Sequence, residues 1–190
     1  MKVIWRRRRE GKTNYRRRKK AILSRKPLLY VFVSNKNVYV QVIKPEMGGD
    51  KVLASASSKD LVKMGWKFGC KSLPAAYLVG LIIGKKAKNA GIKEAILYTG
   101  VKKFISGSRV AAVVKGAIDS GLEIPFDEDA APNEERILGK HIIDYYNMLK
   151  ESDQEAAKKQ FSSLSGKGIE SLPEEVEKFK TMILGGEGED

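Results

Sequence analysis

The chain has 190 residues, of which 42% are hydrophobic and 31% are charged. This apolar content is enough for a core, so a wholly disordered chain is excluded. A net charge of +13, from 36 Lys and Arg against 23 Asp and Glu, predicts a polyanionic partner or an anionic membrane surface. One cysteine excludes an internal disulfide, and with one histidine it argues against a zinc site. The sequence shows no secretory signal and no run of ~20 apolar residues, so a cytoplasmic protein is expected.

The excess positive charge lies in the N-terminal segment. Residues 1–36 contain 14 basic residues and one acid, Glu10, whereas the rest of the chain contains 22 of each. The basic runs 6–9 and 16–20 repel themselves and favour a polyanion as partner. Thr13 is the candidate N-cap of a short helix that runs toward Leu23. Residues 1–26 are therefore predicted to form a basic RNA-binding arm, with a solvated tail or an address signal as the alternative.

The candidate phosphate contacts are mainly the basic side chains of this arm, because arginine offers phosphate a planar bidentate fork. Tyr15 is included because, like Trp5, it lies among the arginines and could stack on unpaired bases; alternatively it packs on the folded domain. Three basic residues near predicted loops are weaker candidates. The full set is Arg6, Arg7, Arg8, Arg9, Lys12, Tyr15, Arg16, Arg17, Arg18, Lys19, Lys20 and Arg25 in the arm, and Lys67, Lys71 and Arg109 beyond it.

The pattern of residues 27–122 predicts one α/β (α+β) core domain. Apolar and β-branched residues predict three strands joined by short turns: 28–33, 38–43 and 51–57. The next elements are predicted to be a helix, a strand and a helix: 75–89 after Leu73-Pro74, 94–99, and from Ser106 or Ser108 to Gly121. The β-β-β-α-β-α order predicts a mixed four-stranded sheet with helices on at least one face.

Residues 123–190 are predicted to form a helical C-terminal extension. An acidic linker over residues 127–135 precedes three short amphipathic patterns. The apolar positions of these patterns are, in chain order, Ile142, Tyr146 and Leu149; Phe161 and Leu164; and Val176, Phe179 and Ile183 after Pro173. The predicted helices dock either on the core domain or on a partner protein.

The same element order occurs in ribonuclease-H-like nucleases, in which converging carboxylates hold two metal ions. Here the first predicted strand contains no acid, the fourth contains only Glu94, and Asp119 cannot complete a cluster alone. Residues 80–86 are not a phosphate loop, because Lys86 replaces the Ser or Thr that holds magnesium. We therefore expect no catalytic residue, no metal site and no cofactor.

Eight motifs spread over nearly the whole chain occur together: 6–15, 49–56, 65–66, 74–80, 107–110, 121–125, 134–137 and 139–142. Their combination resembles the 5S-rRNA-binding family of large ribosomal subunit proteins, the universal eighteenth protein of that subunit in its archaeal and eukaryotic form. The resemblance implies a non-enzymatic structural constituent of the ribosome, with a ribonuclease-H-like layout that lacks the catalytic acids.

The resemblance further implies the partners. They are 5S rRNA, the large-subunit (23S-type) rRNA to which 5S rRNA is attached in the central protuberance, and neighbouring large-subunit proteins, including another 5S-binding protein. It implies a cytoplasmic ribosome and no membrane partner; a membrane-surface protein would need a large apolar helix face beside the basic run. An extraribosomal nucleic-acid-packaging protein stays open as the alternative.

Overall fold

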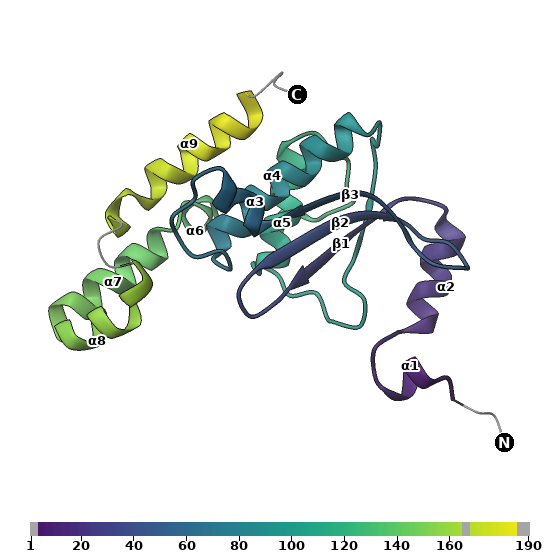
Figure 1. Cartoon of the computed structure of the whole chain (residues 1–190), viewed down its shortest axis with the longest axis horizontal. Coiled ribbons are helices and arrows are strands. Elements are labelled where there is room, and N and C mark those ends of the chain that lie inside the picture. The colour runs from purple at the N-terminus through teal and green to yellow at the C-terminus, as the bar shows by residue number, and fades with distance from the viewer. Residues whose placement is uncertain (1–3, 165–167, 186–190) are drawn as a thin grey trace.

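A four-stranded sheet forms the centre of the computed structural model, which describes residues 4–164 and 168–185 (Figure 1). Its strands lie in the order β3-β2-β1-β4. Their bounds are β1 (Leu28–Val33), β2 (Val38–Lys44), β3 (Lys51–Ser57) and β4 (Ile96–Tyr98). β1 pairs antiparallel with β2 and parallel with β4, and β2 pairs antiparallel with β3, so the predicted mixed sheet is confirmed. Strand β4 is shorter than predicted, because Glu94 forms only an isolated bridge with Glu123.

Two helices cover the inner face of the sheet: α4 (Leu73–Asn89) and α5 (Arg109–Asp119). The Oγ of Ser72 caps α4 by accepting a hydrogen bond from the backbone N–H of Ala75 at 3.3 Å. The two helices touch at backbone level, since a Cβ on Gly80 would lie 2.2 Å from the carbonyl oxygen of Val113, and one on Gly116 would lie 2.2 Å from that of Tyr77. Glycine is therefore required at both positions of this crossing.

Short helices occupy segments for which no helix was predicted. Helix α3 (Ser58–Lys63) follows β3 directly and begins with a capping box formed by Ser57 and Asp60. The expected acidic linker contains the 3-10 helix η1 (Glu128–Ala130) and helix α6 (Glu134–Ile137). Hydrogen bonds between neighbouring residues decide such one-turn elements, and apolar periodicity does not reveal them.

The C-terminal part is helical, as the amphipathic patterns predicted. It contains α7 (Lys140–Ser152), α8 (Gln154–Gln160), α9 (Leu172–Gly185) and the 3-10 helices η2 (Ser162–Leu164) and η3 (Ile169–Ser171). Phe161 and Leu164 lie after α8 and not within it: Phe161 is its C-cap, and Leu164 ends the 3-10 helix η2. The last five residues of the predicted extension, and the first three of the predicted arm, lie outside the described residues.

Helix α9 contributes to the main hydrophobic core. The apolar residues along its inner side are buried in the same cluster as the inner face of the sheet and α4: Leu172, Val176, Phe179 and Ile183. Trp66 lies between Phe68 and Phe179, with its ring centroid 5.3 Å from each. The core thus continues past residue 122, and of the two predicted places for α9 the core domain is the one that it occupies.

Candidate nucleic-acid interface

The predicted arm contains two helices, α1 (Arg6–Arg9) and α2 (Tyr15–Ser24), at the end of the molecule away from α9 (Figure 1). The N-cap of α2 is Asn14, whose Oδ1 accepts hydrogen bonds from the backbone N–H groups of Arg16 and Arg17 at 3.1 and 3.2 Å. Thr13, the predicted cap, instead accepts a hydrogen bond from Nε of Arg7 at 2.8 Å. Asn14 lies one residue closer to the helix, where a side-chain oxygen reaches its free N–H groups.

One side of α2 is held against the outer face of the sheet. Ala21 packs on Leu28 and Ile43 in a small cluster that is separate from the main core. Arg17 and Arg18 lie on the same side of the helix, at four and three residues before Ala21. Two of the five consecutive basic residues therefore face the domain, because Arg17 and Arg18 donate hydrogen bonds to oxygen atoms on it.

The acceptors of the two arginines lie in distant loops. Nη1 of Arg17 donates to the carbonyl oxygens of Gly100 and Lys102 at 3.2 and 3.3 Å. Arg18 donates through Nη1 to the carboxylate of Asp50 at 2.9 Å and through Nη2 to the carbonyl oxygen of Glu46 at 3.1 Å. The hydrogen bond to Asp50 raises the pKa of Arg18 above its ordinary value. Both guanidinium groups thus serve as anchors for α2.

The other side of α2 presents positive charge to solvent. Arg16, Lys19 and Lys20 are exposed at i, i+3 and i+4, which places them on one helix face. Arg25 is also exposed and ends the helix with a positive φ of 55°. Within the described residues none of these four side chains forms an ion pair. This outward basic face leaves its charges available to an anionic ligand.

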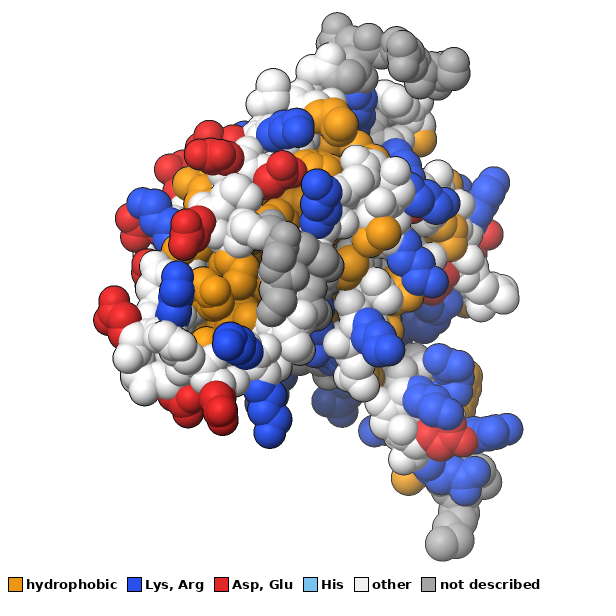
Figure 2. All heavy atoms as spheres, turned by 60° about the vertical axis from the view of Figure 1, so that its left-hand side comes forward, with side chains coloured by type: hydrophobic (Ala, Val, Ile, Leu, Met, Phe, Trp, Pro, Cys, Tyr) orange, Lys and Arg blue, Asp and Glu red, His pale blue; other side chains and the backbone are white. Residues whose placement is uncertain are grey.

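Helix α1 carries a second group of basic side chains. Glu10 pairs with Arg6 and Lys12, each at 2.8 Å, and the hydrogen bonds from Lys12 and then Arg6 lower the pKa of Glu10. Arg8 and Arg9 are exposed, with no ion pair in the described part of the chain. Figure 2 shows the basic side chains crowded on the projecting arm, whereas acidic side chains gather on the opposite side of this view.

Tyr15 and Trp5 pack on each other. Their rings meet edge to face, with centroids 4.8 Å apart and an interplanar angle of 70°. Trp5 is exposed and Tyr15 is half-buried. The pair therefore joins the start of α2 to the residue before α1, and one aromatic surface stays accessible.

The three weaker candidates lie away from the arm. Lys67 and Lys71 lie in the same loop as Trp66, whose ring packs on Phe179 of α9. Helices α9 and α2 lie at opposite ends of the molecule in Figure 1. Arg109 begins α5, next to a segment that is tied to η1 by a hydrogen bond from the N–H of Gly107 to the carbonyl of Ala130. The structure does not bring these three residues together with the arm.

The open part of the outer sheet face carries residues that were not among the candidates. Tyr30, Phe32, Tyr39 and Tyr98 share this face, and the Nζ of Lys102 lies 4.8 Å from the centroid of the Phe32 ring. A cavity of about 230 Å³ is lined by Tyr30 and Tyr98 from the sheet and by Thr13, Asn14 and Arg18 from the arm. The alternation of Tyr30 and Phe32 within β1 was the available signal, but it also fits a face covered by helices.

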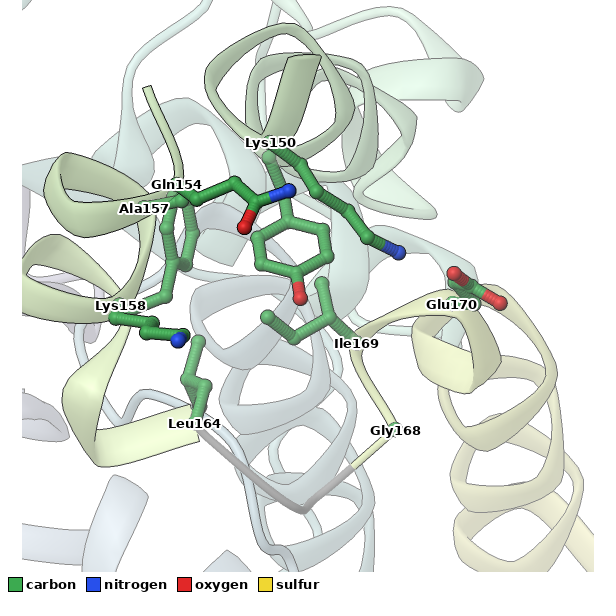
Figure 3. A pocket seen from close by; sticks show the side chains of 10 residues that line it. Lys150, Gln154, Ala157, Lys158, Leu164, Gly168, Ile169 and Glu170 are labelled. Atoms are coloured by element: carbon green, nitrogen blue, oxygen red, sulfur yellow. The ribbon is translucent and has the colours of Figure 1, made fainter. Parts of the chain in front are cut away.

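A hollow in the C-terminal part offers different chemistry (Figure 3). Its described lining combines apolar side chains such as Leu164 and Ile169 with Lys150, Lys158 and a single acid, Glu170. This lining contains no histidine and no cysteine, and Glu170 is its single carboxylate. Elsewhere in the described residues, no three His, Cys, Asp or Glu side chains gather as metal ligands. No helix in the described segments is long and apolar enough to cross a membrane.

A comparison with known protein families supports the ribosomal interpretation. The model of one family, described as "Ribosomal large subunit proteins 60S L5, and 50S L18", matches residues 1–96. The match includes the arm, β1 to β3 and the core helix α4, and covers just over half of the chain. The chain therefore belongs to this family of large-subunit ribosomal proteins, whose role is structural and whose ligand is rRNA.

Proposed function

We propose that this protein binds 5S rRNA and attaches it to the large-subunit rRNA in the central protuberance of the cytoplasmic ribosome, beside another 5S-binding protein. The outward basic face of α2 carries the proposal. Arg16, Lys19, Lys20 and Arg25 are exposed on a helix that Arg17 and Arg18 fix to the sheet. A positioned row of cations binds phosphates at a lower entropic cost than a mobile tail does.

The chemistry of the arm favours RNA over a lipid surface. The basic face of α2 includes a single large apolar residue, the exposed Leu23, whereas membrane-surface helices bury a continuous apolar face. Arginine forms six of the seven basic residues from Arg6 to Arg17, and its planar fork suits phosphate oxygens. The family of the chain points to the same ligand class.

The proposal is tested by removing the outward charges alone. The arm variant is the triple substitution Arg16→Gln, Lys19→Gln, Lys20→Gln. The control removes the same number of positive charges from exposed lysines of α8 and α9 through Lys158→Gln, Lys159→Gln, Lys178→Gln. Each lost phosphate contact reduces the slope of log affinity against log salt by about 0.7–0.9. We expect the arm variant to lose about two units of slope and the control to keep the wild-type slope.

The identity of the RNA is tested in the same binding assay. The wild-type protein is titrated with 5S rRNA and with an unrelated structured RNA of equal length, at several salt concentrations. A clear preference for 5S rRNA supports the proposal. Equal affinity for both RNAs would favour the packaging alternative, and an arm variant that matches the control would show that the outward face is not the binding surface.

A further inference from the structure

The strand register places the side chains of the outer sheet face in three rows. The first row joins Ile96, Leu28, Ile43 and Val52 across the sheet; the second joins Tyr98, Tyr30, Gln41 and Ser55; the third joins Phe32, Tyr39 and Ser57. Helix α2 covers the first row through Ala21, which packs on Leu28 and Ile43. Tyr30 and Tyr98 of the second row pack beside this cluster, and the third row is not part of it.

The third row is the most accessible aromatic surface of this face. Phe32 is 40% exposed although it lies within a strand of the central sheet. Tyr39 lies beside it with the ring centroids 6.4 Å apart and an interplanar angle of 33°. Tyr30 and Tyr98 form a second pair in the neighbouring row, with centroids 6.2 Å apart. Contiguous apolar patches at a protein surface often mark binding sites.

The charges around the third row are positive. Lys102 lies over the Phe32 ring, and its backbone carbonyl receives the guanidinium of Arg17, which joins the aromatic row to α2. The turn between β1 and β2, residues 34–37, adds Lys36 and no acid. The acids that border the sheet at its other end are engaged, Asp50 by Arg18 and Glu46 by Lys44. The potential over the row therefore attracts an anionic ligand.

We propose that Phe32 and Tyr39 form a base-stacking platform for unpaired nucleotides of the bound RNA. The inference rests on the proposed function and specifies which part of the RNA the outer sheet face binds. Exposed aromatic residues on a four-stranded sheet stack bases that are free of pairing, and basic neighbours hold the backbone phosphates. The ring centroids of Phe32 and Tyr39 lie 6.4 Å apart on neighbouring strands, so the platform offers two adjacent aromatic surfaces.

A duplex or a protein fits this surface less well. The bases of a duplex are stacked and paired, so their flat faces cannot reach Phe32 and Tyr39. A protein partner would need acids opposite Lys36, Lys102 and Arg17, and it would also have to approach beside the charged arm. A nucleic-acid strand satisfies both conditions, because each nucleotide supplies one flat base and one phosphate.

The test removes the rings without changing the charge. The full-length double variant Phe32→Leu, Tyr39→Leu is compared with wild type and with Tyr145→Leu, which removes a ring of matched exposure, 39%, on α7. The probes are 5S rRNA, a ten-nucleotide RNA without self-complementarity, and a duplex of equal length. We expect the double variant to lose at least about tenfold in affinity for the single strand, with an unchanged salt slope and unchanged duplex affinity.

A second measurement uses the unaltered protein. Photocrosslinking with a ten-nucleotide RNA containing 4-thiouridine should label peptides that contain Phe32 or Tyr39, and the conservative variant Phe32→Tyr should bind like wild type. Single-strand affinity of the double variant equal to wild type, or an equal loss for single strand and duplex, would overturn the platform, as would crosslinks confined to the arm. A wild-type protein that binds no 5S rRNA would instead refute the proposed function.

Discussion

Helices α2 and α9 pack on the same domain, yet different forces hold them. Helix α9 buries Leu172, Val176, Phe179 and Ile183 in the main cluster, whereas α2 buries only Ala21 and is fixed by the guanidinium groups of Arg17 and Arg18. Burial of a large apolar side chain contributes about 1.5–3 kcal/mol, and an exposed ion pair contributes less than about 1 kcal/mol. Stability is thus expected to depend on α9, and RNA binding on α2.

Truncation at either end gives the largest expected difference. A chain that ends at Ser171 lacks four buried side chains worth about 6–12 kcal/mol, which is comparable to the whole stability of a domain. A chain that begins at Pro27 lacks one buried alanine. We expect thermal melting to lose its cooperative transition in the first chain and to keep it in the second, while the second loses tight RNA binding. Similar melting of the two chains would contradict this division.

A single substitution in α9 sharpens the comparison. Phe179 is 4% exposed and lies against Trp66, so Phe179→Ala is expected to lower the free energy of unfolding by about 3–5 kcal/mol. The control is Met182→Ala on the same helix, where the side chain is 48% exposed. Chemical denaturation measures both variants, and a control as damaging as Phe179→Ala would show that burial of the side chain does not decide the effect.

The smallest expected effect concerns the anchor of α2. Asp50→Asn removes the carboxylate that pairs with Arg18, and both side chains are partly exposed, so global unfolding should change by less than about 1 kcal/mol. Hydrogen exchange of the α2 amides should nevertheless become faster. Glu46→Gln is the matched control, because the backbone carbonyl of residue 46 still accepts the hydrogen bond from Arg18. Equal protection of α2 in both variants would show that the carboxylate does not position the helix.

The sheet was predictable because each strand carries its own apolar pattern, from the continuous run of β1 to the alternation of β2. The boundaries of β4 and the positions of the one-turn helices were not predictable, because an isolated β-bridge and helix-capping hydrogen bonds determine them. Within the arm, sequence identifies the basic residues but not the two sides of α2. Arg17 and Arg18 bind loops that are 83 and 32 residues away, and such partners leave no local pattern.

Sequence also identifies the aromatic residues of β1 and β2 but not their environment. A tyrosine or phenylalanine in a strand is equally typical of a face under helices and of an open one. The short contact of α2 through Ala21 leaves Phe32 exposed, and this depends on where the arm crosses the sheet. The arrangement of the whole molecule was therefore needed to recognise this surface.

The way in which α2 is anchored also affects how the sequence can vary. Three of the four acceptors for Arg17 and Arg18 are backbone carbonyls, those of Gly100, Lys102 and Glu46. Every amino acid supplies a carbonyl, so substitutions at Lys102 and Glu46 leave the acceptors in place, whereas Gly100, with a φ of 64°, favours glycine. An inserted or deleted residue in either loop would move them. Related sequences are thus expected to tolerate many residue types in these loops but to keep the loop lengths.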